Sequence, residues 1–399
     1  MRQLAVWFLL ILTIIATANY VLIVVRAPKG HRLTDVGRAY HTTTHNGKFC
    51  VAFNVTKAEG SFRQDGLEPI TLAIHTTTQY LHILDEQIRS WDGPISLSLF
   101  VEHDSLAAVQ YLIDWHKCNS TISQKLSVHI VHQLAAFQEQ CQPISRFERS
   151  VHCDNFTLKY KNGFPKSLTS PFAIYPINVM RNVARRGAPS KIHLVSDIEM
   201  IFRQSNCSEK FALRAKKLAN EHIRKGSRKL LVIRRFELEK GVPVPRNHTD
   251  LKKLVDKRRA HEYHHKLFPR GHTIEALWEW FKRSKAKTEP YVWEIPYKSS
   301  AWEPQLILHA TDPMNEEGMP TRLRDQQALV YELCRANYKF LMVSQLFNVH
   351  RGVKRNNTKM DYAVIEHQSQ LKNSSYARYI KRINSAYPKT TKRCGIFRM

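Results

Sequence analysis

The chain has 399 residues, and 61 Lys or Arg against 34 Asp or Glu give it a formal net charge of +27 at pH 7. A positive charge of this size raises the question of nucleic acid binding. Seven Asn-x-Ser/Thr sequons predict a luminal address for most of the chain, which excludes nucleic acid as a partner. The charge then fits either a solvated basic surface or a field that gathers anionic ligands, such as nucleotide-sugar diphosphates or acidic glycans.

The N-terminal segment Leu4–Val25 is almost entirely apolar. Its roughly 22 residues, at about 1.5 Å per residue, suffice to cross a hydrocarbon core of about 30 Å. The small-residue triplet Ala16-Thr17-Ala18 also fits a cleaved signal peptide, but the apolar run continues to Val25 and favours an uncleaved anchor. The sequence therefore predicts a tail at residues 1–3, a transmembrane signal-anchor at 4–25, a stem at 26–68 and a globular domain at 69–399.

The charges that flank the anchor point to the opposite orientation from the sequons. Arg2 lies on one flank and Arg26, Lys29 and Arg32 lie on the other, which under the positive-inside rule alone would leave the chain in the cytosol. The sequons argue for the lumen, because N-glycosylation occurs there. They occur at Asn54, Asn119, Asn155, Asn206, Asn247, Asn356 and Asn373.

Seven cysteines are scattered along the chain without Cys-x-x-Cys spacing. They are Cys50, Cys118, Cys141, Cys153, Cys207, Cys334 and Cys394. This arrangement suits one to three disulfides better than a zinc site, and an odd count leaves at least one thiol free or intermolecular.

Strands and helices alternate from residue 69 onward. The sequence predicts strands at 69–76, 95–101, 126–132, 192–195 and 230–233, and helices at 79–91, 105–116 and 174–184. A strand, a helix and a second strand in this order open a parallel sheet, so the predicted fold class is α/β. Residues 141–172 are rich in loops, and 246–287 are basic and rich in His, with several possible helices.

Two carboxylates follow the apolar run Ile192–Val195. Residues i and i+2 of a strand point to the same side, so Asp197 and Glu199 at a strand end can reach one cation. Hard divalent ions such as Mn2+ or Mg2+ prefer oxygen ligands, and such an ion can hold the diphosphate of a sugar nucleotide as a leaving group. Taken alone, the triplet is also typical of a solvated loop.

Three histidines in the basic stretch, His261, His264 and His265, suggest a second metal site. No cysteine or carboxylate accompanies them at ligand spacing, which favours a solvated polar face instead.

Several segments in register resemble glycosyltransferase family 49. They are Trp91–Ser96, Tyr175–Ala184, Asp197–Met200, Trp302–Pro304, Phe347–Gly352 and the ending Tyr387–Cys394. The resemblance covers residues 70–394 and implies a GT-A type nucleotide-diphospho-sugar transferase fold behind an N-terminal transmembrane helix. It also implies a type II Golgi membrane enzyme with a luminal domain, a requirement for Mn2+ (or Mg2+), a UDP-sugar donor and inversion at the anomeric carbon.

The resemblance also assigns a metal site. In this family the two acids of an Asp-x-Asp motif and a later histidine hold the metal, and the matching positions here are Asp197, Glu199 and His350. Without the resemblance, a histidine that ends an apolar run is more often a packed or capping residue.

Donor contacts are predicted around these positions. Arg351 and Lys354 can neutralise diphosphate oxygens, and Asn178 and Arg181 lie one helical turn apart as further candidates for the nucleotide. Arg181 and Asn178 are also compatible with a surface helix packed on the sheet. Thr76 and Thr77 end the first strand, where open α/β sheets bind ligands, and are predicted to lie near the uridine.

An inverting transfer needs a general base opposite the leaving group, because the acceptor hydroxyl must lose a proton. Counting without gaps, Glu316 falls where the family has the aspartate of an Asp-Glu-Arg-Phe type motif, and it is the predicted base. The chain departs from the family pattern at Glu199 and Glu316, each one methylene longer than aspartate. It departs again in the loop, where Gly318-Met319 and Arg322-Leu323 stand in place of Arg-Phe and Tyr-Gly.

The expected activity is transfer of glucuronic acid or N-acetylglucosamine from its UDP form to a hydroxyl of a glycan or glycoprotein. Catalytic geometry is sensitive at about the 1 Å level, so the departures can alter donor choice or abolish turnover. The alternative is a catalytically silent luminal relative that binds a glycan or another transferase as a scaffold.

Overall fold

The computed structural model describes residues 39–102, 105–161, 163, 175–202 and 211–398. Residues 40–399 form one compact unit. The predicted tail, the predicted anchor and the sequon at Asn206 lie outside the described residues. Within the described ranges, no helix is both long enough and apolar enough to cross a membrane.

The strands are β1 (Ala39–Tyr40), β2 (Thr42–His45), β3 (Phe49–Thr56), β4 (Ile70–Thr77), β5 (Ile95–Phe100), β6 (Leu126–Gln133), β7 (Ile144–Ser145), β8 (Ile192–Asp197), β9 (Lys229–Leu238), β10 (Ala260–Glu262), β11 (Val292–Ile295), β12 (Gln305–His309) and β13 (Lys339–Arg351). The α-helices are α2 (Leu84–Ser90), α3 (Leu106–Cys118), α4 (Ser120–Lys125), α5 (Phe156–Lys159), α6 (Ile177–Arg186), α7 (Phe211–His222), α8 (His248–Asp256), α9 (Pro269–His272), α10 (Leu277–Ala286), α11 (Asp325–Arg335), α12 (Lys359–Ser369), α13 (Lys372–Ala386) and α14 (Thr391–Cys394). Short 3-10 helices are η2 (Thr78–Ile83), η4 (Cys153–Asn155) and η5 (Pro388–Thr390).

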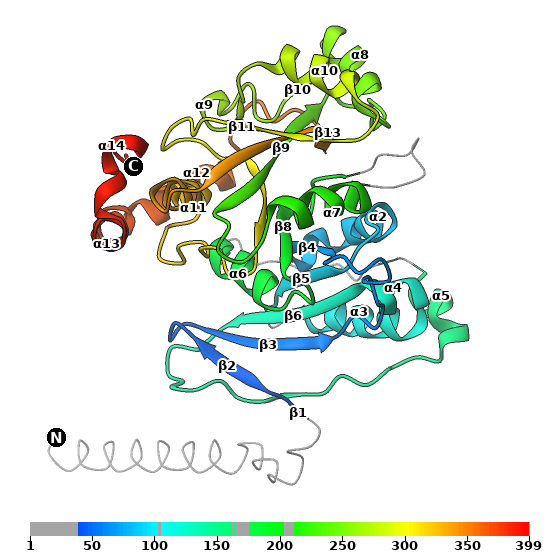
Figure 1. The fold of residues 1–399 in the computed structure, drawn as a ribbon. Coiled ribbons are helices and arrows are strands. Elements are labelled where there is room, and N and C mark those ends of the chain that lie inside the picture. The colour runs from blue at the N-terminus through cyan, green and yellow to red at the C-terminus, as the bar shows by residue number, and fades with distance from the viewer. Residues whose placement is uncertain (1–38, 103–104, 162, 164–174, 203–210, 399) are drawn as a thin grey trace, which may run out of the picture. The chain divides into compact units, whose positions relative to one another are not determined.

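Eleven strands of the described residues form one mixed sheet (Figure 1). Ten follow the spatial order β11-β13-β9-β12-β8-β4-β5-β6-β3-β2, and β10 pairs with β9. Strands β8, β4, β5 and β6 are mutually parallel, whereas β12 runs antiparallel to both β8 and β9. The fold is therefore mixed α/β, and its parallel part agrees with the sequence-based prediction.

Burial explains why these segments form central strands. Every residue of β5 is buried, and in β4 only Thr77 is not. Helices cover both faces of these strands, so the polar side chains within them, such as Ser96, are buried as well as the apolar ones. On one face, Leu72, Leu97 and Leu194 belong to a large core that includes residues of α2, α3 and α7. On the other face, Val179 and Val183 of α6 pack with Phe100 and Val131.

The structure places part of the expected stem in the sheet. Residues 26–68 were assigned to a stem because they lack sustained periodicity, yet β3 (Phe49–Thr56) pairs antiparallel with β6. A disulfide joins Cys50 of β3 to Cys141, and β2 pairs with β3. The globular unit therefore includes residues 40–68, because long-range pairing and a crosslink stabilise strands whose local sequence pattern is weak.

Three disulfides join the six described cysteines: Cys50–Cys141, Cys118–Cys153 and Cys334–Cys394. This number lies at the upper end of the predicted range, and the seventh residue, Cys207, lies outside the described residues. Of the sequon asparagines that the structure describes, none is buried. Their positions are therefore compatible with attached glycans.

Gly187 sets the close approach of α6 to β6. A Cβ atom at this position would overlap the ring of His129, which is fully buried and hydrogen bonded to Ser96 and to the backbone N–H of Asn54. We expect Gly187→Ala to destabilise the fold by about 1–3 kcal/mol, because overpacking forces the helix or the ring to move. Chemical denaturation would measure this loss. Gly318→Ala, where the nearest atom is the flexible Glu316 Oε1 at 3.3 Å, is the control and should be near neutral.

Candidate functional site

The carboxyl ends of four strands meet at one edge of the sheet. Strands β4 and β8 are parallel, β9 and β13 are parallel, and antiparallel β12 between β8 and β9 makes the two pairs run the same way. The chain order reverses between β4 and β8, since β5 and β6 follow on one side of β4 and β8 lies on the other. Such a switch point leaves a crevice where open α/β sheets bind ligands.

The turn after β8 brings Glu199 to His350. Strand β8 ends at Asp197, so Glu199 does not follow the strand alternation that the sequence analysis assumed. Gln87 of α2 donates from Nε2 to the carbonyls of Ile198 and Met200, at 2.7 Å each. Ile201 then bridges to Val349 of β13. As a result, Glu199 Oε1 lies 4.0 Å from His350 Nε2.

Asp197 is held by three neighbours. His75 Nε2 lies 3.2 Å from Asp197 Oδ1, and Arg181 Nη2 lies 3.9 Å from the same oxygen. Arg235 Nη2 lies 3.6 Å from Oδ2. Burial would raise the pKa of Asp197, but His75 and the two guanidinium groups hold it well below its usual range. Asp197 is therefore a carboxylate throughout the physiological pH range.

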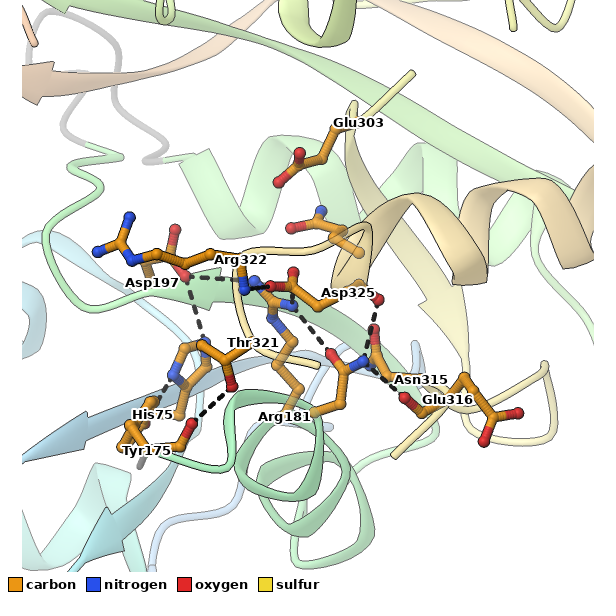
Figure 2. A network of polar contacts seen from close by, with 12 residues as sticks. His75, Tyr175, Arg181, Asp197, Glu303, Asn315, Glu316, Thr321, Arg322 and Asp325 are labelled. Carbon is orange, nitrogen blue, oxygen red and sulfur yellow. Dashed lines mark hydrogen bonds and ion pairs between the residues drawn. The ribbon is translucent and has the colours of Figure 1, made fainter. Parts of the chain in front are cut away.

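A buried hydroxyl orients the His75 ring. Tyr175 Oη lies 2.8 Å from His75 Nδ1 (Figure 2). Burial raises the pKa of Tyr175 well above its usual range, so the hydroxyl keeps its proton and can donate it to Nδ1. Burial also lowers the pKa of His75, which leaves the ring neutral with its proton on Nε2, facing Asp197. The Tyr175 contact thus sets the orientation of the His75 ring, whose Nε2 lies 3.2 Å from Asp197 Oδ1.

Arg181 lies between Asp197 and Asp325, the first residue of α11 (Figure 2). Its Nη1 lies 3.0 Å from Asp325 Oδ1 and donates to Asn178 Oδ1 at 3.0 Å. Burial lowers the pKa of Arg181, but Asp325 and Asp197 raise it above the usual value, so the guanidinium stays charged. The Asn178 amide donates to the carbonyls of Glu316 and Asp325.

The donor set of Asp197, Glu199 and His350 fits a hard or borderline divalent ion. The side chains are 36%, 46% and 22% exposed, so an ion can reach them. His350 Nδ1 lies 3.0 Å from the carbonyl oxygen of Gly352, which places the ring proton on Nδ1 and leaves the Nε2 lone pair facing Glu199. Within the described residues, no three His, Cys, Asp or Glu side chains are grouped closely enough to hold a metal as they stand.

The residues predicted to bind the sugar-nucleotide donor differ in whether their side chains are available to a ligand. Thr76 and Thr77 do end β4, and the Thr77 hydroxyl is buried without a hydrogen-bond partner. Lys354 lies beyond β13 and contacts Asp361, with 2.8 Å between Nζ and Oδ2. Arg351 pairs with Glu86. In contrast, Asn178 is only 2% exposed and makes its hydrogen bonds within the fold, so the structure does not present it to a donor.

Glu316 lies apart from the Asp197 cluster. Its Oε2 accepts from Arg382 Nε and Nη2 at 3.0 and 2.8 Å. It lines a cavity of about 310 Å³ with Glu317, Glu332 and Arg186, whereas Asp197 and Arg181 line a separate pocket. The ungapped count that selected Glu316 could not detect that the loop turns this side chain toward α13.

The histidines of the basic stretch also find protein partners. His261 stacks on His265 with 4.0 Å between ring centroids, and His265 Nδ1 lies 2.7 Å from Glu237 Oε1. The sequence pattern did not associate Glu237 with these histidines, because the two segments are far apart in local spacing and meet only in the fold.

Several residues of the site were absent from the sequence-based prediction. His75, Tyr175, Arg235 and Asp325 all contact Asp197 or its neighbours, and Glu303 faces the same network (Figure 2). A signal existed for Arg235, because two arginines directly follow the apolar run Leu230–Ile233 and precede Phe236. Tyr175 and Glu303 stood in segments that carried the family resemblance without an assigned role.

Comparisons with known proteins agree on one class of enzyme. A family model described as glycosyl-transferase for dystroglycan matches residues 69–388. Beta-1,4-glucuronyltransferase 1 of Danio rerio is 26% identical over 88% of this chain and 82% of its own length. Xylosyl- and glucuronyltransferase LARGE2 of Mus musculus is 23% identical over 70% of this chain and 34% of its own length.

One comparison concerns a solved structure. The crystal structure of GalNAc-T7 with UDP, GalNAc and Mn2+ is 10% identical, with a TM-score of 0.40, over 84% of this chain and 56% of that one. A TM-score of this size is too low to support an inference about function.

Proposed function

The chain belongs to glycosyltransferase family 49, and from that premise we propose that it transfers glucuronic acid, or N-acetylglucosamine, from a UDP-sugar to a glycan hydroxyl with inversion. We further propose a GT-A type fold, dependence on Mn2+, and a type II Golgi membrane address with the catalytic unit in the lumen. The name and 26% identity of the fish relative support glucuronic acid as the first donor to test. The scaffold alternative has no observation in its favour.

The observation that carries this proposal is the donor set at the switch point. Asp197 ends β8 beside β4, at the edge where open α/β sheets bind nucleotide ligands, and the turn after it brings Glu199 Oε1 to 4.0 Å from His350 Nε2 of β13. A divalent ion bound there would neutralise charge on the diphosphate leaving group. The longer Glu199 reaches His350 from a turn rather than from the strand, which supports the view that its extra methylene is compatible with metal binding.

Side chains of the protein would also stabilise the diphosphate leaving group and hold the metal ligands in position. Arg235 carries positive charge beside Asp197, and such charge stabilises a phosphate leaving group as it departs. Lys354 can contribute only if a ligand displaces Asp361, its present partner. His75 holds Asp197 Oδ1, so the carboxylate does not need to reorient when the donor binds. Arg351 can contribute only if a ligand displaces Glu86, its present partner.

The test is release of UDP by the purified full-length chain with Mn2+, a panel of UDP-sugars and a panel of glycan acceptors. We expect turnover with one donor, abolished by a chelator and restored by added Mn2+. Calorimetry with UDP should show binding that requires Mn2+. A folded protein that neither binds UDP with Mn2+ nor turns over any donor would refute the proposal.

A further inference from the structure

Trp302, Glu303 and Pro304 form a segment to which the proposed function assigns no role. Trp302 is buried and packs against Phe340, with 5.1 Å between ring centroids. The backbone N–H of Glu303 donates to the carbonyl of Gly271 at 2.7 Å, and the carbonyl of Pro304 accepts from Gln326. The backbone is thus fixed on both sides of Glu303. Figure 2 shows its carboxyl group directed toward the side of the network that contains Asp197 and Asp325.

Two other carboxylates near the site already have hydrogen-bond or ion-pair partners. Asp325 receives Arg181 on Oδ1 at 3.0 Å and the backbone N–H of Arg322 on Oδ2 at 2.6 Å. Glu316 is paired with Arg382. By contrast, the Glu303 carboxyl oxygens accept no hydrogen bond from the described residues, and His272 Nε2 lies 4.0 Å from Glu303 Oε2. Its side chain is only 18% exposed.

The surroundings of Glu303 keep its proton affinity high. Burial, and next to it the charge of Asp325, raise the pKa of Glu303 to about 7, against the opposing effect of Arg235 and Arg181. Burial holds the pKa of His272 well below its usual range, so that ring is neutral and does not offset the carboxylate. The charged or titratable groups that face Glu303 are Asp325, Arg235, Arg181, Asp197, Arg324, Tyr263 and His272.

We propose that Glu303 is the general base of the transfer reaction, an inference that rests on the proposed function. The oxygen of the acceptor hydroxyl forms a bond to the anomeric carbon, and its proton moves to the Glu303 carboxylate. The bond from the anomeric carbon to the diphosphate oxygen breaks, and its electron pair leaves with UDP. A positioned base of this kind accelerates a reaction by about 10²–10⁴-fold, most efficiently when its pKa lies near the working pH.

The first test is Glu303→Gln in the full-length chain, with Glu294→Gln as the matched control, because Glu294 is an exposed residue of β11. We expect UDP release with acceptor to fall about 10²–10⁴-fold in Glu303→Gln, while Mn2+-dependent UDP binding stays unchanged. The wild-type rate should rise with pH through about 7 because the base acts when deprotonated, and the variant should lose this rise. Glu294→Gln should keep both the rate and its pH profile.

A folding defect is excluded by the melting temperature. Because the pKa of Glu303 is raised from 4.5 to about 7 in the folded state, its ionisation lowers the stability of the fold as pH rises from about 4.5 to about 7, so Glu303→Gln should be at least as stable as wild type at pH 8. Glu303→Ala supplied with azide, a nucleophile that has no proton to lose, should form the glycosyl azide.

The outcomes separate the two proposals. If wild type binds no UDP with Mn2+, the proposed function fails. If wild type turns over and Glu303→Gln keeps its rate, or if Glu303→Ala binds UDP but forms no glycosyl azide, the assignment of Glu303 as the base is wrong while the transferase function stands.

Discussion

Asp197→Asn is expected to reduce UDP release by about 10³-fold or more, because the amide removes the negative charge on which the proposed metal site depends. The same change leaves Arg181 and Arg235 facing each other without the carboxylate that now lies 3.9 and 3.6 Å from them. Mn2+-dependent UDP affinity should fall together with the rate. The measurement is steady-state UDP release alongside calorimetric titration of UDP in Mn2+.

Asp256→Asn provides the control for this prediction. Asp256 is 46% exposed on α8 and pairs with Lys252 four residues earlier, and exposed pairs of this kind contribute about 0.3–0.5 kcal/mol. Rate and UDP affinity should match those of wild type. Turnover by Asp197→Asn within tenfold of wild type, roughly 1.4 kcal/mol of barrier, would show that Asp197 is not a metal ligand.

Arg181→Met should destabilise the fold by about 3–5 kcal/mol, the usual cost of removing one partner from a buried ion pair. Arg181 is 4% exposed and touches Asp325, Asn178 and Asp197. Its loss leaves the Asp325 carboxylate buried and unpaired at the first turn of α11. Chemical denaturation would measure the change in the free energy of unfolding.

Arg186→Met on the same helix is the matched control. The Arg186 side chain is 41% exposed and its nearest carboxylate oxygen, on Glu317, is 3.8 Å away. We expect a change below about 1 kcal/mol, as for surface ion pairs in general. Equal destabilisation by both substitutions would mean that Arg181 acts through helix packing and not through its buried charge.

Local patterns in the sequence were sufficient for the parallel core. The segments at β4, β5, β6 and β8 combine apolar residues at strand spacing with a few buried Ser, Thr and His, and the apolar residues were enough to predict the strands. The helix α6 was predicted at its place for the same kind of reason, since its buried face includes Val179 and Val183. The pattern was weaker for β3, whose position in the sheet depends on β6 and on the Cys50–Cys141 disulfide.

Some candidate site residues could likewise be selected from local sequence, whereas others depend on contacts with distant segments. Residue types and their register with the family pattern were enough to select Asp197, Glu199 and His350 as a potential donor set. The sequence selected Glu316 as the candidate base and gave no reason to consider Glu303, the base proposed above, although both are acidic residues in loops. What separates them is contact with distant segments: Arg382 from α13 occupies Glu316, and Gly271 fixes the backbone of Glu303.

The sequence by itself determined the α/β class, the positions of the core strands along the chain and the identity of the acidic motif, because burial and strand alternation act over a few neighbouring residues. Only the tertiary structure decided which charges face one another. Glu199 meets His350 through a turn held by Gln87, and Arg181 meets Asp325 across 144 residues of chain. Such pairings follow from how strands and loops pack in space, which no local pattern encodes.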